Sequence, residues 1–174
     1  MSISLYDVSV RSFLQTVGAV SGFLEKGLAH CTGAGMDPES LVETRLHGDM
    51  LPFRFQLVSV AHHSKGALDG VRAGVFAPPG AIGADLGYAG LQAMIADAHA
   101  ALTAVTAAEI NAFEGKDVVF ALGERKMPFT AEGFLMSFSL PNLHFHATTA
   151  YDILRQAGVP LGKRDYMGAL RMKT

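Results

Sequence analysis

Histidines are the side chains of this sequence best suited to bind a metal ion, and four of them occur in two close pairs. His62 and His63 are adjacent in the middle of the chain, and His144 and His146 follow Pro141 near its end. Neutral imidazole is the commonest metal ligand among side chains. The first question is therefore which of these histidines the fold brings together.

The segment around His144 and His146 has the pattern of an amphipathic helix, which determines which histidine faces inward. Residues four apart share a helix face, so Asn142, His146 and Ala150 lie together. This face is flanked by Phe138, Phe145, Thr149 and Ile153. His144 is two residues from His146, roughly 200° around a regular helix, and should face the surface or an interface. The two histidines cannot chelate one metal ion from such a helix.

The other pair supplies a partner for His146. His63 shares a helix face with three apolar residues, Val60, Ala67 and Val71. It is therefore the better inward candidate of its pair. Helix bundles build metal sites from side chains of facing helices, so His63 and His146 are the predicted metal ligands. The predicted cofactor is a divalent ion: zinc, nickel, iron or manganese.

A stable metal site needs three or four ligands. Gln56 and Asn142 offer amide oxygens, which bind zinc or nickel weakly, and Thr149 completes the predicted pocket. A competing interpretation makes His146 a core histidine that is hydrogen-bonded to Thr149 or to a neighbouring helix, because buried polar groups are normally satisfied. The residues leave both interpretations open.

Composition excludes several classes of protein. The chain has 174 residues, of which 49% are apolar and 17% charged, so it is long and apolar enough for one folded domain spanning residues 1–174. The net charge of −2 and the scattered cationic residues do not suit nucleic-acid binding. Cys31 is the single cysteine, which excludes a disulfide framework and favours a cytoplasmic protein. Neither a signal peptide nor a membrane span is recognisable.

The low charged fraction has a further consequence, because it leaves apolar surface that a second subunit would cover. We therefore expect a homodimer. We expect no nucleic-acid or membrane partner, and the sequence names no small-molecule ligand.

Apolar periodicity predicts a mainly all-α fold, a four-helix bundle with a small β-hairpin before the last helix. Pro128 should confine the second hairpin strand to a sheet edge. Thr130 is the expected N-cap of the last helix and Gly158 its C-terminal stop, and Pro141 should kink it. The expected helices span residues 5–29, 49–73, 85–105 and 131–157, with a short helix after residue 37, a loop over 74–87 and a hairpin over 118–129. Gly33 and Gly35 should end the first of these helices.

Three stretches carry a resemblance to a known family: SLYDVSV, DMLPFRFQLVSVAHHSKGA and LPNLHFHATTAYDILRQAGVPLGKRDYMG. They resemble a bacterial family of uncharacterised proteins, a domain of unknown function in the DinB-like superfamily. The resemblance implies a DinB-like four-helix bundle, usually dimeric. Metal-binding members of that superfamily hold a divalent ion with one histidine from the second helix and two spaced H-x-x-x-H on the last.

Alignment of the helix end LRQAGV places His146 on the second histidine of that motif and Asn142 on the first, with His63 near the second-helix ligand. The resemblance thus implies a degenerate metal or small-molecule site in the bundle core. If the protein is an enzyme, the superfamily suggests a metal-dependent hydrolase or a thiol transferase. The alternative is a non-catalytic dimeric binding or stress-response protein whose core histidines are structural.

Overall fold

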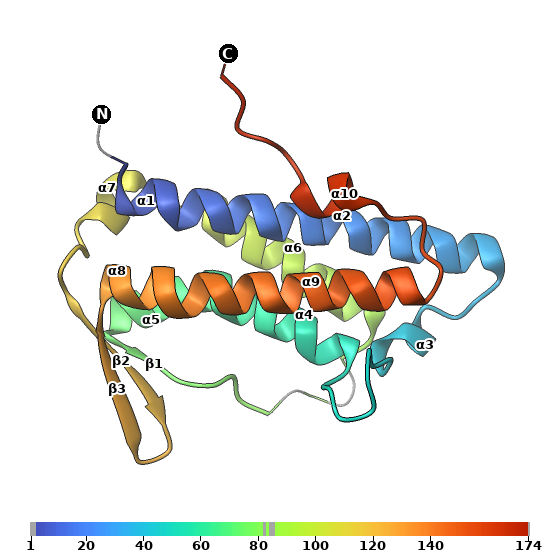
Figure 1. Ribbon diagram of the computed structural model, residues 1–174, viewed down its shortest axis with the longest axis horizontal. Coiled ribbons are helices and arrows are strands. Elements are labelled where there is room, and N and C mark those ends of the chain that lie inside the picture. Colours follow the sequence, from blue (N-terminus) through green and yellow to red (C-terminus); the bar gives the residue numbers. More distant parts are fainter. Residues whose placement is uncertain (1–2, 82, 84–85, 174) are drawn as a thin grey trace.

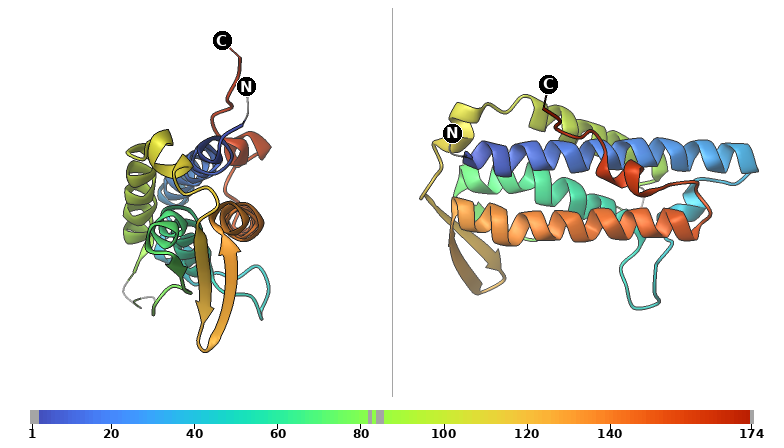
Figure 2. Two further views of the ribbon diagram at one scale, coloured as in Figure 1. Left: turned by 90° about the vertical axis from the view of Figure 1, so that its left-hand side faces the viewer. Right: turned by 45° about the horizontal axis from the view of Figure 1, so that its top comes forward.

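The computed structural model describes residues 3–81, 83 and 86–173, and within them four long helical segments lie side by side as a bundle (Figure 1). Figure 2 (left) shows the four segments end on. Their bounds are as follows: α1 (Leu5–Val8) with α2 (Val10–Ala34); α4 (Phe53–Ala61) with the π-helical turn η1 (His62–Gly66) and α5 (Ala67–Ala73); α6 (Tyr88–Thr103); and α8 (Ala131–Phe134) with the π-helical turn η2 (Leu135–Ser139) and α9 (Leu140–Gln156). Shorter helices are α3 (Glu39–Val42), α7 (Ala107–Asn111) and α10 (Lys163–Met167).

The ends of the long helices follow local chemistry. Gly35 closes α2 with φ +66°, and Gly158 follows α9 with φ +89°, a left-handed conformation that glycine adopts without strain. The Thr130 hydroxyl accepts a hydrogen bond from the Gly133 amide at 3.2 Å and so caps α8. The N-cap predicted at Thr130 and the helix ends predicted at Gly35 and Gly158 are confirmed, and the first helix continues past its last periodic residues, near 29, as far as Gly35.

Large apolar side chains from all four segments form the core. The largest fully buried ones include Phe13, Phe53, Tyr88, Ile95 and Phe134. The Tyr88 hydroxyl is also buried, and it donates a hydrogen bond to the backbone oxygen of Leu24 at 2.8 Å. Each such side chain contributes about 1.5–3 kcal/mol of transfer free energy when it is buried. These buried side chains therefore determine which face of each helix points inward. Polar residue pairs lie where the helices contact one another.

The described strands form one sheet in the order β1 (Val75–Phe76), β2 (Asp117–Leu122) and β3 (Arg125–Thr130). The pairing of β2 with β3 is the predicted hairpin, and Pro128 lies on the edge strand β3, as expected. The loop prediction for 74–87 missed β1, which pairs in parallel with β2. Helix α7 was not predicted either. Phe120 of β2 is buried, and its ring centroid lies 4.7 Å from that of Phe138 in η2, so the sheet packs on the bundle.

Pro141 does not break the last helix. The α8-η2-α9 segment continues across it as one long helix (Figure 1). The residues before it adopt the wider π geometry instead, which accommodates a ring that lacks an N–H and would clash with the carbonyl four residues back. The Asn142 side-chain amide donates to the Phe138 carbonyl at 2.7 Å. A π-helical turn therefore lies where the kink was predicted, and the helix continues through it without a break.

The C-terminal segment returns across the first helical segment. Lys26 and Asp165 form an ion pair of 2.6 Å, and the Gln15 amide donates to the Met167 carbonyl at 2.9 Å. These contacts place α10 against α2 (Figure 1). Over the described residues, no helix has the length and apolar character that a bilayer span requires.

Candidate metal or ligand site

His146 projects from α9 towards α4, where Gln56 holds it. The His146 Nδ1 atom lies 2.8 Å from the Gln56 side-chain oxygen. An amide oxygen only accepts hydrogen bonds, so Nδ1 carries the proton and Nε2 keeps its lone pair. Gln56 is 2% exposed, and its own amide nitrogen donates to the Leu51 carbonyl at 2.8 Å. Both ends of Gln56 are fixed, so His146 has one tautomer and one orientation.

His63 lies beside His146, as the sequence predicted. It comes from the π-helical turn η1 and is 8% exposed. The two imidazole rings are nearly parallel, with an interplanar angle of 10° and centroids 5.9 Å apart. Phe76 and Phe138 each place a ring 5.6 Å from the His63 ring. The two histidines therefore form a pair at the border between the helices and the sheet.

Among the described residues, one fully buried nitrogen of this pair has no hydrogen-bond partner. His63 Nδ1 is buried and makes no hydrogen bond to any described residue. The Ser139 hydroxyl in η2 is likewise buried and makes no hydrogen bond to any described residue. An unsatisfied buried polar group costs about 1–3 kcal/mol. His63 Nδ1 is thus a position where a ligand would replace a missing interaction.

Both imidazoles are neutral at physiological pH. Burial, and then the proximity of His62 and His146, lowers the pKa of His63 from 6.5 to about 3. Burial lowers the pKa of His146 to about 4. Neutral imidazole is the form that binds metal ions. The electrostatics of the pair therefore suit a cation or a hydrogen-bonding ligand at pH 7.

His62 has a different role from His63. Its ring stacks on Phe76 with centroids 4.3 Å apart, and its Nε2 lies 2.8 Å from the Ala77 carbonyl oxygen, to which it donates. Burial lowers the pKa of His62 despite this bond. His62 thus anchors the segment that follows β1 and is not paired with His146.

The other predicted pocket residues are engaged locally. Asn142 bonds to Phe138, as described above, and the Thr149 hydroxyl donates to the Phe145 carbonyl at 2.8 Å. The structural interpretation gave His146 a hydrogen bond to Thr149 or to a neighbouring helix, and the described contacts have the second of these, to Gln56 of α4. The prediction that Phe145 flanks the inward face is wrong: Phe145 is 59% exposed. The buried stripe of α9 runs instead through Leu143, Ala147, Ala150 and Ile153.

His144 and Cys31 lie elsewhere. His144 is exposed and lines a groove on the other side of α9, as its helical position predicted. Cys31 is fully buried, and burial raises the pKa of its thiol, which opposes thiolate formation. Neither residue joins the His63–His146 pair.

The residues fit a two-histidine site but not the three-histidine set of the superfamily. Asn142 occupies the third position, and its amide nitrogen is bonded to the helix backbone. Among the described residues, no group of three or more histidine, cysteine or acidic side chains is close enough to hold a metal ion. Sequence reasoning identified both histidines and Gln56. It missed the contact of Phe76 with His63 and the π-helical turn η1, which have no clear signature in residue type.

Comparison with known families gives the wider context. The sequence matches the family described as domain of unknown function DUF1993 over residues 5–167. The chain belongs to the DUF1993 family. A solved structure of a DinB family member from Shewanella denitrificans is similar to this DUF1993 chain, with a TM-score of 0.79 and 26% identity over 98% of this chain and 95% of that one. The predicted DinB-like fold is thus confirmed. Among curated proteins, none matches this DUF1993 sequence.

Proposed function

We propose that this DUF1993 protein binds a divalent transition-metal ion through His63 and His146, with water or a small molecule as the remaining ligands. The observation that carries the proposal is the buried, unpartnered Nδ1 of His63 beside a neutral His146 ring. Gln56 supports it, because metal-binding histidines usually donate their other N–H to an outer acceptor. A bound ion would supply Lewis acidity for a hydrolytic or thiol-transfer reaction.

Replacement of Asn142 tests this proposal directly. The Asn142→His variant supplies the imidazole that the superfamily pattern has at this position. We expect wild-type protein to bind Zn²⁺ or Ni²⁺ weakly and the variant to bind it roughly tenfold tighter or more, since imidazole is a much better ligand than an amide oxygen. Untagged protein would be titrated by isothermal calorimetry, and metal content would be measured by elemental analysis.

His63→Ala and His146→Ala should each abolish binding in both backgrounds. His99→Ala, which removes a half-buried histidine from α6, is the matched control and should bind as wild type does. If neither wild type nor Asn142→His binds metal, the proposal fails. His146→Ala would then act only on stability, by about 1–3 kcal/mol, because buried Gln56 loses its partner. That outcome supports the non-catalytic binding protein with structural histidines.

We also propose that the chain forms a homodimer through the exposed apolar surface around α9 and the start of α4. Phe145 and Leu51 are 59% and 48% exposed. Large exposed aromatic side chains are typical of subunit interfaces. This surface adjoins the histidine pair, since the Phe145 ring lies 5.2 Å from that of His146.

A further inference from the structure

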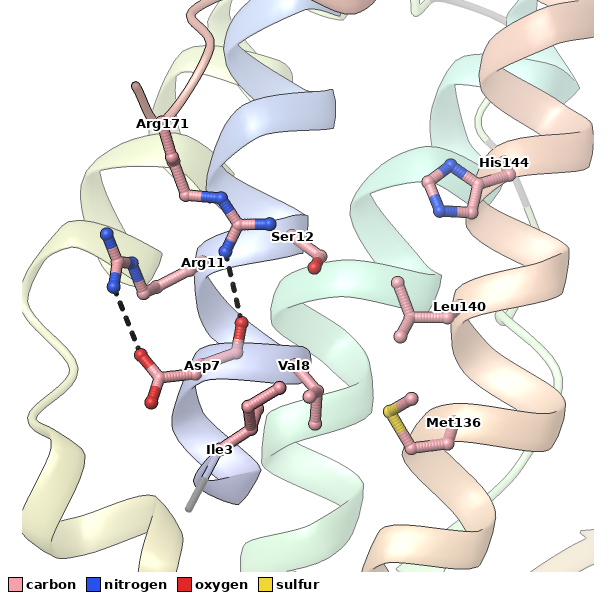
Figure 3. Close-up of a pocket in the computed structure, with 9 residues that line it drawn as sticks. All are labelled: Ile3, Asp7, Val8, Arg11, Ser12, Met136, Leu140, His144 and Arg171. Carbon is pink, nitrogen blue, oxygen red and sulfur yellow. Dashed lines mark hydrogen bonds and ion pairs between the residues drawn. The ribbon is translucent and has the colours of Figure 1, made fainter. Parts of the chain in front are cut away.

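A groove between α1-α2 and the last helical segment has no assigned role. It has a volume of about 790 Å³, within the range of small-molecule sites. Figure 3 shows its two walls, with Asp7, Arg11 and Ser12 on one side and Met136 and His144 on the other. It is separate from the His63–His146 pair, because His144 and His146 leave α9 in different directions.

The C-terminal tail adds a cation to this groove. The Arg171 guanidinium reaches the wall at α1 and donates to the Asp7 backbone oxygen at 3.2 Å (Figure 3). The tail is fixed beside the groove because Gln15 on α2 binds the Met167 carbonyl. Arg171 is thus held in place although it is 164 residues distant from Asp7 in sequence.

The charges of the groove do not cancel. Arg11 pairs with the Asp7 carboxylate at 3.1 Å. Hydrogen bonds from Ser4 and Arg11 lower the pKa of Asp7, so this carboxylate is ionised and compensates Arg11. Arg171 makes no ion pair with an acidic side chain in the part of the chain described by the structure. One positive charge with free donors therefore faces the groove.

Apolar side chains line the groove from both walls. Met136 of η2 is 42% exposed, and Leu140 of α9 and Val8 of α1 also line the groove. Ser12 and His144 offer hydrogen-bonding groups, and together with Arg171 they also line an adjoining pocket to which Val8, Leu140 and Met136 do not contribute. Packing against the protein lowers the pKa of His144, so its ring is neutral at pH 7 and adds no charge. The groove therefore has a cationic end and an apolar end.

We propose that this groove binds a small amphipathic carboxylate, with its anionic head on Arg171 and Ser12 and its apolar chain along Val8, Leu140 and Met136. Arginine donates two parallel hydrogen bonds to a carboxylate, which fixes the head. The groove is open to solvent, and Arg171 of the tail borders it together with the apolar side chains that would contact the chain of the ligand.

The test uses decanoate as the probe, below its micelle concentration, with full-length protein and isothermal calorimetry. Arg171→Gln should weaken decanoate binding about tenfold, as expected for the loss of one charge-assisted contact. Met136→Ser should weaken it several-fold but leave the weak binding of acetate unchanged. Arg125→Gln, on exposed strand β3, is the matched control and should bind as wild type does. Decylamine has the same chain with the opposite charge and should not bind.

Thermal melts would establish that each variant is folded, since all three side chains are exposed. Equal binding of decanoate and decylamine would overturn the proposal, and so would decanoate affinities that neither Arg171→Gln nor Met136→Ser changes. The proposal would also fail if Arg171→Gln converted a dimer to monomers in sedimentation velocity, because the groove would then be a subunit interface. None of these outcomes depends on metal binding at His63.

Discussion

The His63 imidazole is neutral and enclosed, and this makes the folded protein sensitive to acid. A histidine with its usual pKa of 6.5 takes up a proton when the chain unfolds below that pH, whereas folded His63 does so only near pH 3. The unfolded state therefore binds more protons between these values. Stability is retained above pH 6.5 and is lost as the pH falls from 6.5 towards 3.

Protonation of His63 should give the free energy of unfolding a measurable dependence on pH. In metal-free protein, His63 should contribute up to about 1.4 kcal/mol of stability loss per pH unit over that window. Urea unfolding at pH 7.5, 6.0 and 5.0 with a chelator would measure the slope. His63→Gln should flatten the curve relative to wild type, whereas His99→Ala should leave it steep. Parallel curves for wild type and His63→Gln would show that the His63 pKa is not depressed.

At the scale of helices and strands, the contact between α2 and α6 depends on the absence of one side chain. Gly27 of α2 faces the hydroxyl of Tyr88, and a Cβ at this position would collide with it. That hydroxyl is the group that bonds to the Leu24 carbonyl. The two helices are therefore held together by a buried hydrogen bond that only glycine leaves room for.

Gly27→Ala should destabilise the protein by about 1–3 kcal/mol, because Tyr88 must shift and its hydrogen bond is strained. Gly22→Ala is the matched change in the same helix. Nothing lies within 4 Å of a Cβ there, so this substitution should stabilise α2 by about 0.5–1 kcal/mol. Denaturant unfolding of both variants would show opposite signs. Equal effects would mean that only helix propensity matters at these positions.

A helix or strand can be predicted from the sequence when the residues that determine it are close together in the chain. Thr130, Gly35 and Gly158 act within one turn of helix, so the sequence indicates most helix ends. Strand β1 depends on the pairing of Val75 with Val119, and no pattern in the sequence near Val75 predicts this pairing. The histidine pair was predictable because two helix faces must meet in a bundle. Gln56, the partner of His146, was predicted only as a pocket residue. Whether His146 bonds to Gln56 or to Thr149 depends on how far α4 is shifted along α9, which the sequence does not give.

For the whole molecule, the exposed apolar side chains bear on assembly. We expect sedimentation to give twice the chain mass of 18.4 kDa. Phe145→Ser should shift the protein towards monomer, because it removes the largest exposed aromatic of the proposed interface. Leu122→Ser is the control, since Leu122 is 49% exposed at the far end of the hairpin. A wild-type monomer, or dissociation caused equally by both changes, would contradict the assignment.

The contact of Arg171 with Asp7 joins the end of the chain to its beginning, and this sets an order on biosynthesis. The ribosome releases α1 early and Arg171 much later, because 164 residues separate Asp7 from Arg171. The four helical segments have all emerged by then and can already pack together. The groove must therefore be completed after the bundle segments, and a variant truncated before Arg171 would fold into the same bundle with this groove left open.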